Sequence, residues 1–261
     1  MLILVALVSM AVAALTLFSG FGLGSLLMPT FAFFFPLHIA VATTGIVHLA
    51  NNLFKLVLVG KHASLPVAVR FGGPAIPATF VGAVILGSLS EEKQLWSYTL
   101  AGWPFSVTLV GLIMGLLILL FALVDLLPAC DKFQPKQHWL PLGGILSGLF
   151  GGISGHQGAL RAAFLINANL GRDSFIGTNV VCAVTVDIVR LTVYSVTFSS
   201  EVAEVVKDLP SATLLLTATA SAFCGSFLGA RYMKKVTLTM VKRLVGTLLL
   251  LMGLSVAAGW I

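Results

Sequence analysis

The sequence carries very little charge. Of its 261 residues only 9% are Asp, Glu, Lys or Arg, whereas about 25% is usual for a soluble domain. The hydrophobic share is 58% and the mean hydropathy is +1.06, which excludes intrinsic disorder because disorder requires low hydrophobicity. The shortage of polar surface excludes an ordinary soluble fold. The composition therefore predicts an all-α polytopic protein that lies in the lipid bilayer.

Cysteine and catalytic motifs are also scarce. Cys130, Cys182 and Cys224 are odd in number and lack CxxC or Cys/His metal spacing, so neither a disulfide framework nor structural zinc is expected. No HExxH motif, Walker loop or nucleophile elbow occurs, and we therefore expect no enzyme activity, no metal and no cofactor. The net charge of +6 does not indicate a nucleic-acid partner, because the basic residues lie at the ends of apolar segments, where they set membrane orientation.

Apolar runs fill the rest of the chain. A membrane helix needs about 20 apolar residues, so the length allows about ten segments and leaves no room for a soluble domain. The start lacks the basic region of a signal peptide and is expected to form the first helix. The segments at 21–35, 139–154 and 157–170 are short and contain glycine, which predicts broken or re-entrant helices. The expected segments are 2–18, 21–35, 37–59, 65–89, 95–126, 139–154, 157–170, 174–198, 209–230 and 237–260.

Several landmarks occur twice in the same order. SGFGLGSLLMP in the first half corresponds to SGHQGALRAAF in the second. Thr44 follows Gly24 of the first motif by 20 residues, and Thr178 follows Gly158 of the second by the same distance. VGAVILG and CGSFLGA then each precede a polar turn and a long apolar helix. This order predicts two structural repeats of about five helical segments, 1–126 and 139–261, joined by the linker 127–138. The alternative is that glycine-rich apolar sequence resembles itself by chance.

The charges of the connections predict how the repeats are oriented. The basic connection 55–70 has a mostly acidic counterpart at 201–208, and the acidic turn 91–93 has a basic counterpart at 231–243. Because Lys- and Arg-rich loops prefer the cytoplasm, the two halves have opposite bias, as inverted-topology repeats require. Both termini are therefore expected outside and the linker 127–138 in the cytoplasm.

The joint order of these motifs resembles the TauE/SafE family of membrane permeases. Members of that family are viewed as exporters or importers of sulfite and small sulfonated organic anions, so the resemblance implies a secondary transporter in the cell (inner or plasma) membrane of a prokaryote. The family typically has three consecutive glycines in each half, whereas this chain has Gly-Leu-Gly and His156-Gln157-Gly158. The residues that carry the resemblance are Gly20-Phe-Gly-Leu-Gly24 with Pro29, Thr43-Thr44, Ser147-Gly-Leu-Phe-Gly151 through Gly158, Thr178, and Gly225–Gly229 before Arg231.

Charged residues inside apolar segments are the clearest pointers to function, because a charge at the bilayer centre costs about 2.5–3.5 kcal/mol. Arg161 has no carboxylate nearby in the sequence, and its guanidinium suits two oxygens of a sulfonate or carboxylate. Alternatively, it extends to the lipid headgroups. Asp187 and Arg190 share a helix face, where they form either a buried ion pair that keeps the helices in register or part of the substrate site.

Polar residues in the first half extend this set. Asn51 and Asn52, with Lys55, occupy a position similar to that of the Asp187–Arg190 pair and suggest a shared pocket wall; Lys55 equally suits the cytoplasmic end of its helix.

Four further residues are placed near the expected starts of the helices that follow the glycine motifs. Helix N-termini present unpaired N–H groups and partial positive charge, so they receive anions well, as in inverted-repeat transporters. Plain N-capping is the alternative. These residues are Thr43, Thr44, Thr178 and Asn179.

Two histidines are expected at membrane depth. His48 and His156 are candidates for proton coupling, because histidine titrates near neutral pH; alternatively, each bonds a neighbouring carbonyl. Gln157 beside His156 is suited to donate to an anion or to cap a helix.

GxxxG spacings permit close helix approach, and packing within one subunit is the favoured explanation for most of them. Gly111 and Gly115, on a helix that Pro104 is expected to kink, are the predicted face of a homodimer.

The function predicted from the sequence is a secondary transporter of small anions that works by alternating access, with its site between the two glycine motifs. Its expected partners are the anion, the bilayer, and a proton or another coupling ion. A cation carrier is disfavoured because Arg190 would neutralise Asp187. The alternatives are a membrane-embedded enzyme or assembly factor acting on a lipid-soluble substrate, and an anion channel.

Overall fold

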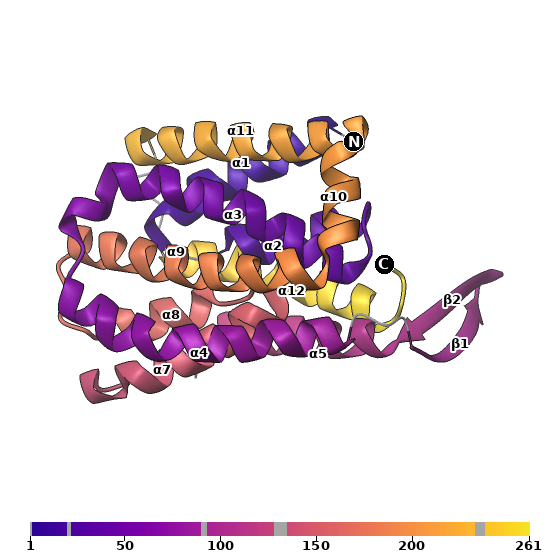
Figure 1. Cartoon of the computed structure of the whole chain (residues 1–261), viewed down its shortest axis with the longest axis horizontal. Helices are drawn as coiled ribbons and strands as arrows, with labels where there is room; N and C mark the ends of the chain where they lie inside the picture. The colour runs from indigo at the N-terminus through magenta and orange to yellow at the C-terminus, as the bar shows by residue number, and fades with distance from the viewer. Residues whose placement is uncertain (1, 20–21, 90–92, 128–134, 233–237) are drawn as a thin grey trace.

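Helices make up most of the chain in the computed structural model (Figure 1), as predicted. The structure describes residues 2–19, 22–89, 93–127, 135–232 and 238–261. The linker predicted at 127–138 therefore lies partly outside the described residues. The elements are α1 (Leu2–Ser19), α2 (Leu23–Ala32), α3 (Leu37–Val59), η1 (Gly60–His62), α4 (Leu65–Leu89), β1 (Gln94–Leu100), β2 (Trp103–Thr108), α5 (Leu109–Leu126), η2 (Gln137–Trp139), α7 (Leu140–Ser154), α8 (Gly158–Leu165), α9 (Arg172–Thr197), α10 (Ser199–Lys207), α11 (Leu209–Tyr232) and α12 (Leu238–Ala257).

The bundle contains both long and short apolar helices. Within the described ranges, five helices are long and apolar enough to cross a membrane: α3 with η1, α4, α5, α9 and α11. By contrast, α2 has 10 residues and α8 has 8. At 1.5 Å per residue these two helices extend only about 15 and 12 Å, half or less of the hydrocarbon thickness of ~30 Å. The segments at 21–35 and 157–170 therefore contain helices too short to cross the membrane, as the sequence predicted, whereas the segment at 139–154 forms one uninterrupted helix of 15 residues, α7.

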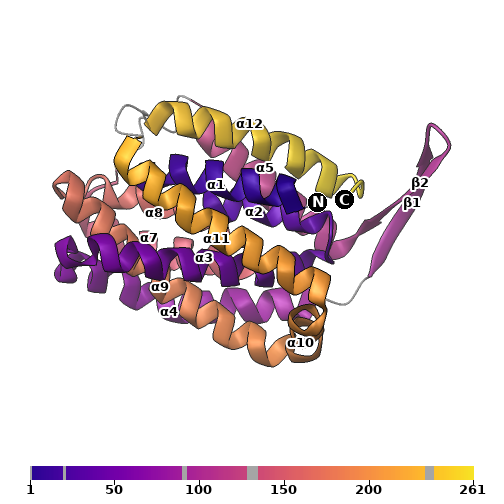
Figure 2. The same cartoon turned by 90° about the horizontal axis from the view of Figure 1, so that it is seen from above.

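The helices pack in pairs that join the two halves of the chain. The main contacts are α1 with α11, α4 with α7, α5 with α12, and α3 with α9. Both termini lie at the end of the bundle from which the two-stranded hairpin projects (Figures 1 and 2). Helices of the first half therefore pack on helices of the second half, and a site at the centre draws its residues from both halves.

Residues 94–108 form a β-hairpin, so the helix expected over 95–126 is wrong in its first part. β1 pairs antiparallel with β2, and Leu100 faces Trp103 across a turn in which Ala101 and Gly102 have φ of 50° and 85°, typical of a tight hairpin turn. The strands are rich in aromatic and β-branched residues, which favour this conformation. The helix α5 starts after Thr108, whose hydroxyl accepts a hydrogen bond from Gly111 N at 3.0 Å.

Two further expectations on this helix are corrected. Pro104 lies in β2 and does not kink α5. The pair Gly111 and Gly115 faces α12 of the same chain: a Cβ at Gly115 would lie 2.5 Å from the backbone nitrogen of Ala257. This face is buried within the subunit and is not a homodimer face. The Gly111/Gly115 spacing therefore serves helix packing within one subunit. A homodimer formed through another surface stays a prediction.

Candidate functional site

The two glycine motifs meet inside the bundle. A Cβ at Gly24, in the first turn of α2, would lie 3.4 Å from the carbonyl oxygen of Gly155 and 3.6 Å from His48 Cδ2. Gly155 ends α7 with φ of 77°, and Gly22 precedes α2 with φ of 113°; both conformations favour glycine. The broken helices α2 and α8 thus begin next to a junction built from backbone.

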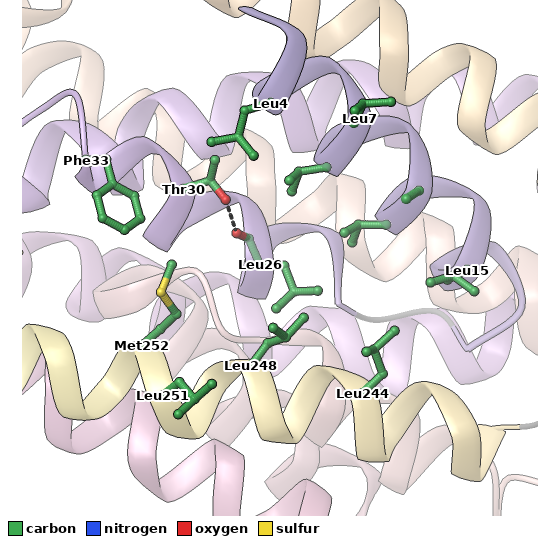
Figure 3. Close-up of a pocket in the computed structure, with 13 residues that line it drawn as sticks. Leu4, Leu7, Leu15, Leu26, Thr30, Phe33, Leu244, Leu248, Leu251 and Met252 are labelled. Atoms are coloured by element: carbon green, nitrogen blue, oxygen red, sulfur yellow. Dashed lines mark hydrogen bonds between the residues drawn. The ribbon is translucent and has the colours of Figure 1, made fainter. Parts of the chain in front are cut away.

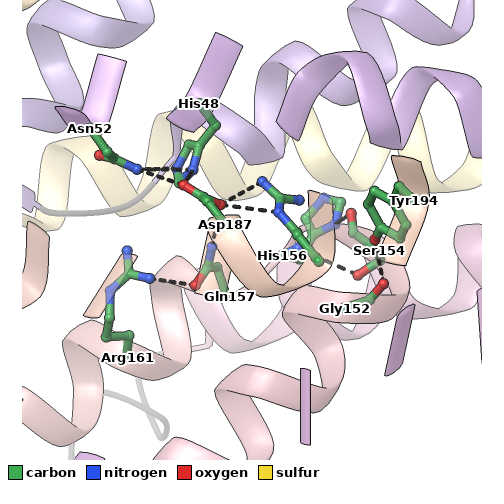
Figure 4. Close-up of polar contacts among 10 residues, drawn as sticks. His48, Asn52, Gly152, Ser154, His156, Gln157, Arg161, Asp187 and Tyr194 are labelled. Atoms are coloured by element: carbon green, nitrogen blue, oxygen red, sulfur yellow. Dashed lines mark hydrogen bonds and ion pairs between the residues drawn. The ribbon is translucent and has the colours of Figure 1, made fainter. Parts of the chain in front are cut away.

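Asp187 is the centre of a buried polar network beside this junction (Figure 4). Its Oδ2 lies 2.6 Å from His48 Nδ1 and accepts from Asn52 Nδ2 at 3.0 Å. Its Oδ1 accepts from Gln157 Nε2 at 3.0 Å, and from Arg190 Nε and Nη2 at 3.0 and 2.8 Å. His48 and Asn52 belong to α3, whereas the other partners follow the linker. One carboxylate therefore joins the two halves of the protein.

Arg161 extends the network through Gln157. Its Nη1 donates to Gln157 Oε1 and its Nε to Asn179 Oδ1, both at 2.7 Å. The side chain is 1% exposed, so the alternative in which it extends to lipid headgroups is wrong. Ser147 Oγ donates to the carbonyl of Gln157 at 3.0 Å and fixes the start of α8. Arg161 is thus linked to Asp187 through the amide of Gln157.

Lys55 adds a third buried cation on α3. With the amide nitrogen of Asn51 toward Ser226 Oγ (2.8 Å) and Ala222 O (3.2 Å), the Asn51 oxygen accepts from Lys55 Nζ at 3.2 Å. Lys55 is only 6% exposed. This arrangement connects α3 to α11 and places Lys55 inside the bundle, so it does not mark a solvated helix end.

The threonines do not lie at helix N-termini, and that expectation is wrong. Thr43 and Thr44 lie more than one turn inside α3, and Thr178 and Asn179 lie equally far inside α9. Thr43 Oγ1 donates to Ile39 O at 2.8 Å, and Thr178 Oγ1 accepts from the backbone N–H of Ser64 at 2.8 Å. The hydroxyl of Thr44 is buried and makes no hydrogen bond. The helix N-termini at the junction are those of α2 and α8.

His156 contacts a backbone carbonyl and an aromatic ring, and its Nε2 is buried without a hydrogen-bond partner among the described residues. Its Nδ1 lies 3.0 Å from the carbonyl oxygen of Ser154, and its ring stacks on Phe121 of α5 with ring centroids 5.8 Å apart. This matches the alternative in which a buried histidine bonds a neighbouring carbonyl. His48, by contrast, is the histidine that contacts the central carboxylate.

Several polar contacts were missed by the sequence reasoning. The hydroxyl of Tyr194 donates to the carbonyl of Gly152, and Tyr194 lies one turn after Arg190 on the same face of α9, a spacing that indicates a shared environment. Ser226 is the polar member of the CGSFLGA motif. Nothing in the local sequence distinguishes Ser147 from other small residues of α7.

The balance of charge in the network is positive. Lys55, Arg161 and Arg190 are buried cations, and Asp187 is the one carboxylate that the network contains among the described residues. The same part of the chain holds no group of three or more His, Cys, Asp or Glu arranged for a metal ion. An excess of fixed positive charge in a low-dielectric interior is suited to an anion.

A large apolar groove lies away from this network, between α1, α2 and α12 (Figure 3). Its volume is about 520 Å³. The one hydroxyl in its lining, that of Thr30, donates to Leu26 O at 2.8 Å. The groove has no group to solvate an anion, so its size does not make it the site. The lining residues are Leu4, Leu7, Val8, Ala11, Val12, Leu15, Leu26, Thr30, Phe33, Leu244, Leu248, Leu251 and Met252.

Comparison with known proteins gives one result. A family model described as "Sulfite exporter TauE/SafE" matches residues 5–256. The match includes both glycine motifs and all residues of the buried network. No curated protein and no solved structure matches the chain.

Proposed function

Because the chain belongs to the sulfite exporter TauE/SafE family of membrane transporters, we propose that it is a secondary transporter of small anions, most specifically sulfite or small sulfonated organic acids. The observation that carries the proposal is the buried network beside the meeting of the glycine motifs, in which Asp187 pairs with Arg190 and is linked through Gln157 to a second buried cation, Arg161. Burying a charge in the membrane region is costly, and charged residues found there commonly belong to a functional site. An anion that binds there offsets the excess positive charge.

We propose that the halves 1–126 and 139–261 are inverted repeats that move against each other. The observed contacts support this: exchanging α1 with α7, α3 with α9, α4 with α11 and α5 with α12 converts the main helix pairs into themselves. In such transporters the site lies at the repeat interface near the bilayer midplane, and alternating access results from one repeat moving against the other. The bonds from His48 and Asn52 to Asp187 cross this interface.

The purified protein in proteoliposomes is expected to catalyse saturable flux of sulfite or sulfoacetate and to show counterflow. An Arg161→Ala variant should lower the initial rate about tenfold or more, because it removes a buried positive charge and the charge-assisted hydrogen bond to Gln157, worth ~1.5–3 kcal/mol. Arg70→Ala, which removes an exposed cation from α4, is the matched control and should leave flux unchanged. Normal flux in folded Arg161→Ala protein would contradict a role for Arg161 in the site.

The same assay separates the other functions that the sequence left open. Flux that does not saturate and shows no counterflow would indicate an anion channel. Chemical conversion of a lipid-soluble substrate with no anion flux would indicate a membrane enzyme or an assembly factor.

We propose that His48 couples anion movement to protons. Histidine is the side chain that ordinarily changes charge near neutral pH, and His48 contacts Asp187 across the interface between the halves. The groups around it are Asp187 and Arg190 from α9, Arg161 from α8, and Asn52 from its own helix. A proton gained or lost at His48 therefore alters the strength of the link between the repeats.

A His48→Gln variant is expected to lose uptake of sulfoacetate driven by a pH gradient but to retain exchange of labelled for unlabelled sulfoacetate. His62→Gln, at an exposed position after α3, is the control and should retain both activities. Gradient-driven uptake that survives in His48→Gln would exclude His48 as the coupling group, and a loss confined to His156→Gln would assign coupling to His156.

A further inference from the structure

We infer that Thr44 Oγ1 and Arg190 Nη1 are the groups that directly contact an oxygen of the transported anion. This inference rests on the proposed function and deepens it. The ligand class is an oxyanion, a group that presents accepting oxygens, as sulfite, sulfonates and carboxylates all do. Arg161, which sequence reasoning placed first as the binding cation, acts instead as a positioning residue.

Thr44 Oγ1 and Arg190 Nη1 are buried and make no hydrogen bond to the described residues, although the Tyr194 hydroxyl, which donates to Gly152 O, interacts with the Arg190 guanidinium. The side chain of Thr44 is 1% exposed and that of Arg190 is 0% exposed. More than about 90% of buried polar groups in proteins have a partner, and an exception calls for an explanation such as a functional role. A guanidinium N–H can only donate, and a hydroxyl can also donate. The missing partner of Arg190 Nη1 is therefore an acceptor, and the Thr44 hydroxyl is able to donate to the same acceptor.

Arg190 and the Thr44 face of α3 are both linked to Asp187, Arg190 directly and α3 through His48. A Cβ at Gly155 would be 2.8 Å from Arg190 Nη1, and a Cβ at Gly45 would be 3.4 Å from Arg190 Cζ. Thr44 is the neighbour of Gly45 in α3 and lies one turn before His48, on the same face of the helix. The guanidinium is thus bounded by glycine on two sides, next to the start of α2 at Gly24.

The other bonds of Arg190 fix where Nη1 points. Its Nε and Nη2 both donate to Asp187 Oδ1, and Asp187 is held in turn by His48, Asn52 and Gln157. A planar guanidinium with two donors fixed has its third nitrogen fixed as well. The donor is therefore held in place before a ligand arrives, which reduces the entropy lost on binding.

Arg161 has a different set of contacts. Its Nε and Nη1 donate to Asn179 and Gln157, and Gln157 donates to Asp187. Arg161 thus supplies positive charge and fixes Gln157. Its hydrogen bonds link it to the Asp187–Arg190 pair through the side chain of Gln157. Its removal should reduce anion flux indirectly, because Gln157 loses a hydrogen bond and the local positive charge falls.

The test is Thr44→Val, which removes the hydroxyl, keeps the shape and breaks no hydrogen bond of the free protein. We expect the half-saturation concentration for sulfite and sulfoacetate to rise about tenfold, because a hydrogen bond to a charged group is lost. Thermal stability in detergent should be equal to or higher than that of the parent, since a buried unpaired hydroxyl is removed. Thr44→Ser, which keeps the hydroxyl, should bind nearly as the parent does.

The matched control is Ser9→Ala. Ser9 also has a buried hydroxyl without a partner among the described residues, but it lies on α1 and outside the network. It should gain stability in the same way and keep the half-saturation concentration of the parent. This control separates the removal of an unpaired hydroxyl from the loss of a ligand contact.

Arg190→Lys is the second arm, because lysine keeps the charge beside Asp187 but lacks the third nitrogen of the fork. In Arg190→Lys, the sulfite concentration that protects half of the protein from heat should rise about tenfold. Parent-like half-saturation in both Thr44→Val and Arg190→Lys would overturn the inference while leaving the transport function intact. A parent protein that moves no anion and is not protected by sulfite would instead overturn the proposed function itself.

Discussion

Asp187→Ala is expected to lose both stability and transport. Asp187 accepts hydrogen bonds from His48, Asn52, Gln157 and Arg190, and its removal leaves the Arg190 guanidinium buried without a counter-charge. Breaking a buried pair in this way costs about 3–5 kcal/mol, a large part of the 5–15 kcal/mol that usually separates folded from unfolded protein. Thermal unfolding followed by size-exclusion chromatography in detergent measures the loss.

A double variant separates the two effects. Asp187→Leu combined with Arg190→Met replaces the pair by apolar side chains, which is often neutral or stabilising. The double variant should recover the part of the unfolding temperature that the unpaired Arg190 costs, although His48, Asn52 and Gln157 still lack their acceptor. It should still transport no anion, because both the donor Nη1 and the link between the halves are gone. An Asp187→Ala protein as stable as the parent would show that the pair does not hold the helices in register.

Gly148→Leu should prevent stable packing of α4 on α7. A Cβ at Gly148 would lie 2.4 Å from the carbonyl oxygen of Ala75, and one at Gly144 would lie 2.0 Å from that of Phe71. The obstacle is backbone, so no side chain can turn away to make room. Overpacking of a core commonly costs about 1–3 kcal/mol and sometimes more; here four new carbon atoms meet a helix. The yield of monodisperse protein and its unfolding temperature should both fall sharply.

Gly73→Leu is the matched control for this prediction. Gly73 lies on the exposed side of α4, and a Cβ there would meet nothing within 4 Å. Leucine is a better helix former than glycine by ~0.5–1 kcal/mol, and lipid accepts its side chain. Gly73→Leu should therefore fold at least as well as the parent. Equal behaviour of the two variants would mean that the α4–α7 interface does not require a small residue.

The same close approach occurs on the other side of the bundle. A Cβ at Gly225 of α11 would lie 2.1 Å from Met10 O on α1, and one at Gly82 of α4 would lie 2.2 Å from Leu149 O on α7. Gly82 and Gly225 are the corresponding positions of the VGAVILG and CGSFLGA motifs. Sequence comparison within the chain thus identified equivalent positions, although it did not identify the helices that they contact.

The site was predicted unevenly for a physical reason. Arg161, Asp187 and Arg190 were identified because charge inside an apolar run is a local signal that needs no knowledge of the fold. Their partners were not, because His48 meets Asp187 across 139 positions of the chain. The roles of Thr43 and Thr178 were misplaced although the expected segments 37–59 and 174–198 start close to the observed helices: both threonines lie more than one turn inside α3 and α9, beyond the unpaired N–H groups of the first turn. The hairpin was missed because short apolar runs suit strands and helices alike.

Composition and hydropathy by themselves determined that this protein is a helical membrane protein. A chain with so much apolar surface is stable in lipid rather than in water, and in lipid its backbone groups must form hydrogen bonds within each helix. The order of the motifs determined its family. Only the tertiary structure decided which cation holds the central carboxylate, which donors remain unpaired, and which glycines carry the helix contacts. Those properties depend on distances between atoms that the sequence separates widely, and local patterns contain no information about such distances.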